Sequence, residues 1–90
     1  MRKRLGVNID HIATLRNARG EKHPDPYTVA LNVLKAGANS ITVHLREDRR
    51  HIKDKDLKIL SSNKSIPINL EIASNPQMIN IALKNKPSFI

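Results

Sequence analysis

The chain has 90 residues, and its sixteen Lys and Arg against eight Asp and Glu give a formal charge of +8. This charge favours anionic partners such as nucleic acid, acidic membranes or phosphorylated metabolites, but only Tyr27 and Phe89 are aromatic, so a stacking platform for single-stranded nucleic acid is poorly supplied. The absence of cysteine excludes disulfides, thiolate metal sites and zinc fingers, and the longest uncharged stretch, residues 72–83, is too short and too polar to span a bilayer.

The first residues favour a strand over a targeting signal. Three basic residues at positions 2–4 resemble the start of a signal peptide, but Asn8, Asp10 and His11 interrupt the apolar stretch that should follow. Residues 5–9 instead form a short β-type run. With neither cysteine nor a targeting segment, the sequence is compatible with a reducing compartment, and we expect a cytoplasmic protein with no membrane partner.

A polar connection is expected after this strand, and the helix that follows it has both ends marked in the sequence. Asp25 can serve as the N-cap and Pro26 as the first helical residue, while Gly37 offers a left-handed stop. Between them, four apolar residues recur at helical spacing: Val29, Ala30, Val33 and Leu34.

The strand and helix pattern then continues to the end of the chain. Residues 40–45 predict a β-branched strand, residues 54–61 a short helix and residues 67–72 a third strand. The next helix repeats the cap-plus-proline start at Asn75 and Pro76. Its predicted apolar face consists of Met78, Ile79, Ala82 and Leu83.

Residues 88–90 look like a fourth strand that is cut short. Strands that alternate with helices predict an α/β fold with parallel strands joined by right-handed crossovers. No linker or change in composition marks a second domain, so we expect residues 1–90 to belong to one domain.

Polar residues recur on one side of each predicted strand. Side chains of a strand alternate between its two faces, so one face is apolar and the other polar. In a barrel wrapped by helices, the polar face points inward and its last residues open at the C-terminal mouth, where barrel enzymes place their chemistry. The sequence therefore predicts five polar groups at one rim: Asn8, Asp10, His44, Arg46 and Glu71. A purely structural role does not readily explain five such groups in one place, because a buried charge without a partner is costly.

Each of these residues also has a simpler structural interpretation. A single histidine such as His44 can be a hydrogen-bonded structural residue, and Glu71 can merely pair with Arg46. The segment of residues 15–20 can be a solvated loop, or it can fold Arg19 over the rim, where a guanidinium grips a phosphate in bidentate fashion.

His11 and His51 follow the first and second strands on polar connections. They can be ligands or ordinary surface groups.

Several long runs of the sequence resemble pyridoxine 5'-phosphate synthases. The run GVNIDHIATLRNARG at residues 6–20 is similar to the opening signature of that family. The runs PDP at residues 24–26, GA at 37–38, ITVHLREDRRHI at 41–52 and NLE at 69–71 follow in the family's order and spacing. The resemblance covers essentially the whole chain.

The resemblance implies a cofactor-free and metal-free transferase. It condenses 3-amino-2-oxopropyl phosphate with 1-deoxy-D-xylulose 5-phosphate, closes the pyridine ring, and releases pyridoxine 5'-phosphate, phosphate and water. Carried over by position, the implied roles fall into three groups: His44 and Glu71 in acid–base catalysis, Asn8 and Arg19 at the aminoketone phosphate, and Asp10, His11, Arg46 and His51 on the deoxyxylulose phosphate side.

The resemblance further implies the N-terminal part of a (β/α)8 TIM barrel, with roughly three and a half strand–helix units ending within the fourth strand. The family's later catalytic histidine and its phosphate-binding loops would lie beyond residue 90, and its full-length members imply a homo-oligomer. Two competing hypotheses are an inactive truncated remnant of such an enzyme and a small basic nucleic-acid-binding module.

Overall fold

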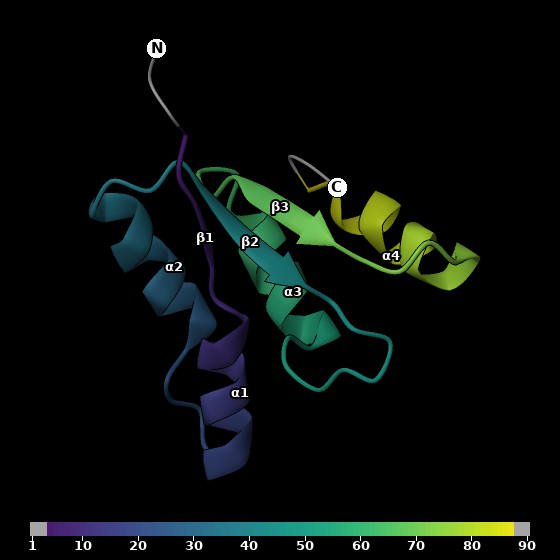
Figure 1. The fold of residues 1–90 in the computed structure, drawn as a ribbon, viewed down its shortest axis with the longest axis horizontal. Coiled ribbons are helices and arrows are strands. Elements are labelled where there is room, and N and C mark those ends of the chain that lie inside the picture. Colours follow the sequence, from purple (N-terminus) through teal and green to yellow (C-terminus); the bar gives the residue numbers. More distant parts are fainter. Residues whose placement is uncertain (1–3, 88–90) are drawn as a thin grey trace.

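The computed structural model describes residues 4–87 and contains three strands and four helices (Figure 1). In chain order they are β1 (Gly6–Asn8), α1 (Asp10–Arg19), α2 (Pro26–Lys35), β2 (Ser40–His44), α3 (Asp54–Ser62), β3 (Ile68–Glu71) and α4 (Pro76–Asn85). The strands form one parallel sheet in the order β1-β2-β3, which confirms the predicted α/β class. The predicted fourth strand at residues 88–90 lies outside the described residues.

The core lies between one face of the sheet and the helices. The alternate residues of β2 and β3 that were predicted to be apolar are at most 1% exposed, and they include Ile41, Val43 and Leu70. They pack with buried side chains from each of the four helices, among them Leu57 of α3 and Met78 of α4. Burying a side chain of this size stabilises a fold by about 1.5–3 kcal/mol. The predicted apolar parity of these two strands is therefore confirmed.

The helix starts that were predicted at two prolines are confirmed. Asp25 accepts a hydrogen bond from the backbone of Tyr27 at 3.1 Å, and Asn75 accepts one from the backbone of Met78 at 2.9 Å. Gly37 follows the end of α2 with a φ of 120°, a conformation in which a side chain would be strained. No helix within residues 4–87 is long and apolar enough to cross a membrane.

The prediction of a polar connection after the first strand is wrong, because residues 10–19 form helix α1. Ala13 is fully buried and Ile12 packs against the core, so the helix has a narrow apolar contact with the rest of the molecule. Asp10 lies in the first turn and Arg16 and Arg19 in the last turn, where their charges match the helix dipole. The helix ends at Gly20, whose φ of 66° is left-handed.

Half of the predicted apolar face of α4 points away from the core. Met78 and Ala82 are fully buried, but Ile79 is 44% exposed and Leu83 is 64% exposed. Residues four apart share a side of a helix, whereas the next residue lies about 100° further around it. Ile81 packs against the core in place of Ile79 and Leu83, so the side of α4 that faces the core is rotated by part of a turn from the predicted one.

Candidate functional site

A buried carboxylate joins the end of β1 to the end of β2. Asp10 is 8% exposed, and its Oδ1 accepts a hydrogen bond from the backbone N–H of His44 at 2.8 Å. Its Oδ2 accepts a second one from Nδ2 of Asn8 at 3.0 Å, while the backbone N–H of Asp10 donates to Oδ1 of Asn8 at 2.8 Å. Strand alternation placed Asp10 on the same side of the first strand as Asn8, but β1 ends at Asn8 and Asp10 begins α1. The start of the helix turns the carboxylate back toward β2.

The end of β3 lies beside this group. His44 pairs with Glu71 in the register of β2 and β3, and the backbone N–H of Leu45 donates to the carbonyl of Glu71 at 3.1 Å. The structure therefore brings Asn8, Asp10, His44 and Glu71 to the C-terminal ends of three adjacent parallel strands. Glu71 and Asn8 are exposed there, and His44 is half-buried.

Arg46 lies just beyond this group, in the loop after β2. The strand ends at His44, but the alternation of burial continues one step further, with Leu45 buried and Arg46 half-buried. Nε of Arg46 donates to Asp48 at 3.3 Å, and both side chains are more than 40% exposed. This is the ion pair that Arg46 forms, in place of the alternative pair with Glu71. Together with Ala73, these loop residues and His44 line an open depression of about 340 Å³.

Hydrogen bonds hold the pKa of Asp48 below its usual range. The largest cause is the backbone N–H of Arg50, which donates to the carboxylate at 3.0 Å. The hydrogen bond from Arg46 and the positive charges of both arginines act in the same direction.

A second cluster forms where α1 meets the loop between β2 and α3. Nδ1 of His51 lies 2.5 Å from the hydroxyl of Thr14, and the rings of His11 and His51 meet edge to face with their centroids 5.6 Å apart. Nδ2 of Asn17 donates to the carbonyl of His51 at 2.9 Å and to that of Arg50 at 3.3 Å. The structure thus brings the two predicted histidines together through residues of α1.

An ion pair below this cluster anchors α1 to α3. The guanidinium of Arg16 donates to both carboxylate oxygens of Asp56, at 2.5 and 2.8 Å, and the two side chains are only 12% and 11% exposed. The hydrogen bonds to Asp56 raise the pKa of Arg16 above its ordinary value. Neither residue was a predicted site residue, and neither was Thr14 or Asn17. If residues 10–19 had been predicted as a helix, Thr14 and Asn17 could have been identified as neighbours, because they are three residues apart on one helix face.

Arg19 stands apart from both clusters. It ends α1, so it lies about 13 Å along the helix axis from Asp10. Its side chain is 53% exposed and pairs with Glu21 at 3.1 Å. The alternative of a solvated loop over residues 15–20 is wrong in its backbone, which is helical to Arg19, although the side chain is solvated as that alternative expected.

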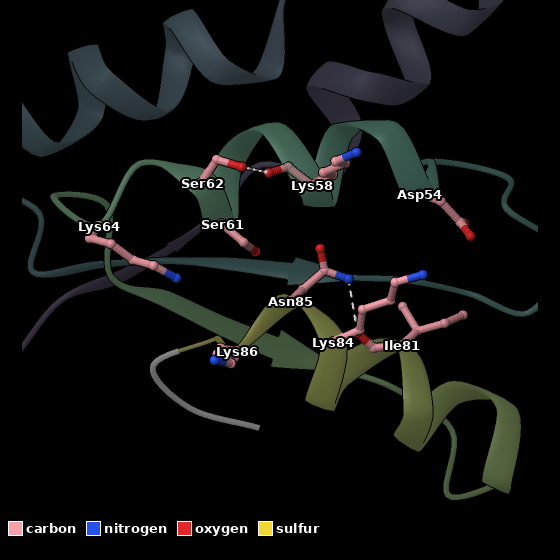
Figure 2. Close-up of a pocket in the computed structure, with 9 residues that line it drawn as sticks. All are labelled: Asp54, Lys58, Ser61, Ser62, Lys64, Ile81, Lys84, Asn85 and Lys86. Carbon is pink, nitrogen blue, oxygen red and sulfur yellow. Dashed lines mark hydrogen bonds between the residues drawn. The ribbon is translucent and has the colours of Figure 1, made fainter.

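A separate cavity of about 670 Å³ lies between α3 and α4 (Figure 2). Its lining includes four lysines, Lys58, Lys64, Lys84 and Lys86, and none of its residues was predicted as a site residue. Lys84 is in the last turn of α4, where a cation offsets the negative end of a helix. Within residues 4–87, no group of three or more His, Asp or Glu side chains has a geometry that could hold a metal ion.

Comparisons with known proteins agree with the sequence resemblance. A family model described as pyridoxal phosphate biosynthesis protein PdxJ matches residues 5–90. Curated relatives named pyridoxine 5'-phosphate synthase include one from Pelagibacter ubique, 62% identical over 88 residues, and one from Rhodopseudomonas palustris strain BisB18, 61% identical over 87 residues. One from Idiomarina loihiensis is 55% identical over 86 residues. These alignments cover 96–98% of this chain but only 34–37% of each relative, so the chain spans about a third of their length.

Proposed function

The chain belongs to the PdxJ family of pyridoxal phosphate biosynthesis proteins, and from this membership we propose that it forms the first part of a pyridoxine 5'-phosphate synthase. The reaction joins 3-amino-2-oxopropyl phosphate to 1-deoxy-D-xylulose 5-phosphate and closes the pyridine ring, with release of phosphate and water. The three-stranded sheet is then the opening segment of a (β/α)8 barrel, and α1 is an additional helix in its first strand-to-helix connection.

One observation carries this proposal. The groups joined through Asp10, which are the Asn8 side chain and the His44 backbone, lie at the C-terminal ends of parallel strands, the end of the sheet where barrel enzymes gather their catalytic groups. A carboxylate can accept about four hydrogen bonds, and Asp10, which is 8% exposed, uses two of them within the chain. Asp10 thus holds Asn8 and the backbone of His44 in place, and its own proposed substrate contact is on the deoxyxylulose phosphate side.

His44 and Glu71 are the proposed acid–base pair. Joining an amine to a ketone, dehydrating the adduct and closing the ring all move protons on and off oxygen, nitrogen and carbon. An imidazole can both give and take protons near neutrality, and a positioned acid–base group typically contributes about 10²–10⁴-fold in rate. Their register pairing across β2 and β3 supports a joint role.

The remaining proposed contacts involve the two phosphorylated substrates. Asn8 and Arg19 bind the aminoketone phosphate, while His11, Arg46 and His51 bind the deoxyxylulose phosphate. Arg19 must leave Glu21 and approach the strand ends to do so. Exposed ion pairs of this kind are worth at most about 1 kcal/mol, so a dianionic phosphate can displace Glu21.

We further propose that the whole enzyme acts without a cofactor or metal ion, in the cytoplasm, and as a homo-oligomer. The phosphorylated substrates account for the positive charge of the chain without a nucleic-acid partner.

A chimera tests the proposed function. The 90 residues are joined to the remaining two thirds of the Pelagibacter ubique relative, and formation of pyridoxine 5'-phosphate is measured with both substrates. We expect the chimera to make the product and the 90-residue chain alone to make none. We expect His44→Gln and Glu71→Gln each to lower kcat by about 10²–10⁴-fold.

The matched control is His23→Gln, because His23 is an exposed histidine of the loop between α1 and α2. This variant should retain full activity. A chimera without activity, beside an active full-length relative, would refute the proposed function and favour an inactive remnant. Equal activity of the His44 and His23 variants would instead refute the catalytic role of His44.

A further inference from the structure

We propose that Thr14 is a positioning residue that holds the His51 ring in its Nδ1–H tautomer, so that Nε2 accepts a hydrogen bond from a substrate hydroxyl. The role at the substrate rests on the proposed function, which places His51 beside deoxyxylulose phosphate. The tautomer rests only on contacts within the chain.

The direction of the hydrogen bonds follows from the single proton of the Thr14 hydroxyl. Oγ1 of Thr14 lies 3.2 Å from the carbonyl oxygen of Asp10 and 2.5 Å from Nδ1 of His51. A carbonyl oxygen can only accept, so the contact with Asp10 is a hydrogen bond only when the hydroxyl proton is donated to Asp10. The contact with His51 is then a hydrogen bond only if Nδ1 carries a proton and donates it to Thr14. In a neutral imidazole this leaves a lone pair on Nε2.

The backbone of His51 is fixed by the same face of α1. Asn17, three residues after Thr14, donates from Nδ2 to the carbonyl of His51 at 2.9 Å. The guanidinium of Arg16 donates to Oδ1 of Asn17 at 2.8 and 3.1 Å, which leaves Nδ2 to face the loop. The ring of His11 contacts the half-buried ring of His51 edge to face. Asn17 thus fixes the backbone of His51 and His11 packs against its ring, while Thr14 sets the orientation of that ring.

The chemical consequence is selectivity for a hydroxyl group. A lone pair on Nε2 accepts a hydrogen bond from a hydroxyl, whereas it repels the anionic oxygens of a phosphate. Deoxyxylulose phosphate carries both kinds of group. The neutral ring of His51 then recognises the sugar part of this substrate and leaves its phosphate to a cation such as Arg46.

Nitrogen NMR of the histidine rings tests the tautomer directly. The ¹⁵N-labelled 90-residue chain is studied without substrate at about pH 8, above the ordinary histidine pKa of about 6.5. We expect Nδ1 of His51 to have the shift of a protonated nitrogen and Nε2 that of an unprotonated one. Thr14→Ser keeps the hydroxyl and should preserve this pattern, while Thr14→Val should move both shifts toward the Nε2–H form. The exposed ring of His23 serves as the internal control and should not change.

A dominant Nε2–H form in the unmodified chain, or an unchanged ring in Thr14→Val, would overturn the proposal. The substrate role is measured separately in the chimera. There, Thr14→Val should raise KM for deoxyxylulose phosphate about tenfold while kcat and KM for the aminoketone phosphate stay within about twofold, and Thr14→Ser should restore the lower KM. If the expected tautomer is found but KM is unchanged, the role of His51 in recognising the substrate hydroxyl is refuted, and the tautomer assignment stands. A chimera without any activity would refute the proposed function and leave the tautomer standing.

Discussion

At the scale of single residues, the Asp10 carboxylate connects the Asn8 side chain at the end of β1 to the His44 backbone at the end of β2. Its two oxygens have different partners, since Oδ1 accepts from the His44 backbone and Oδ2 from the Asn8 side chain. A buried donor that loses its acceptor costs about 1–3 kcal/mol. The two contacts can therefore be separated by substitutions that remove one or both of them.

Asp10→Asn should break only the contact with Asn8, because an amide oxygen can still accept from the His44 backbone while the amide nitrogen faces the Asn8 donor. Asp10→Ala should break both. Because Asn8 is exposed and its amide can bond to water, we expect Asp10→Asn to lower the free energy of unfolding by about 0.5–1.5 kcal/mol and Asp10→Ala by about 1.5–3 kcal/mol, measured with urea. Hydrogen exchange of the His44 amide should accelerate in Asp10→Ala and stay slow in Asp10→Asn. Asp48→Asn, a change at an exposed carboxylate, should cost less than about 0.5 kcal/mol. Equal exchange of His44 in all variants would contradict the assigned contact.

At the scale of elements, the sequence predicts best those segments whose apolar residues follow one period. The alternation in β2 and β3 was predictable for this reason, and the starts of α2 and α4 were predictable because a capping side chain and a proline mark each of them. Helix α1 was not, because its core contact is limited to residues such as Ala13 and Ile12, and its other side chains bind polar partners on a distant loop and on α3.

The same limit applies to the candidate site. The strand pattern predicted that Asn8, His44 and Glu71 would gather at one edge of the sheet, since consecutive parallel strands usually lie side by side and their C-terminal ends meet at the same edge. The contact of His51 with Thr14 joins residues 37 positions apart. It could not be predicted because Thr14 lies on helix α1, whose mostly polar sequence was interpreted as a connection. The position of Arg19 depended on the same missed helix.

The ion pair between α1 and α3 gives a prediction at this scale. Arg16→Gln and Asp56→Asn should each cost about 1–3 kcal/mol in the free energy of unfolding, because each leaves a mostly buried charge without its partner. The double variant should cost less than the sum of the two, with a coupling energy of about 0.5–3 kcal/mol. Urea unfolding of the four proteins measures this cycle, and the exposed pair of Arg19 and Glu21 is the matched control, with a coupling below about 1 kcal/mol. Additive losses at Arg16 and Asp56 would show that the two elements are not coupled through this contact.

At the scale of the whole molecule, the described residues form a compact unit with two unpaired strand edges and an excess of positive charge. The radius of gyration is 12.7 Å, close to the value of about 12 Å expected for a folded domain of this length. Within residues 4–87, β1 and β3 each pair only with β2, so both outer strands present an open edge. Each of the five ion pairs in this part of the chain uses an arginine, so the lysines contribute to the excess positive charge without such a partner.

This charge distribution predicts that added salt stabilises the chain. Screening weakens repulsion among exposed lysines, while the mostly buried pair of Arg16 and Asp56 is screened much less. We expect the free energy of unfolding to rise by about 0.5–1 kcal/mol between low and high potassium chloride, measured with urea.

The lysines at the cavity between α3 and α4 should account for much of this salt dependence, because four of them line one space (Figure 2). Replacing Lys64 and Lys84 by glutamine should reduce the dependence by about half. The matched control replaces Lys22 and Lys35, which are exposed outside this cavity; Lys35, like Lys84, lies in the last turn of its helix. Both pairs of substitutions remove the same charge and one favourable interaction with a helix end. A larger effect of the first pair therefore reports the local crowding of charge, and equal effects would mean that only the net charge of the chain matters.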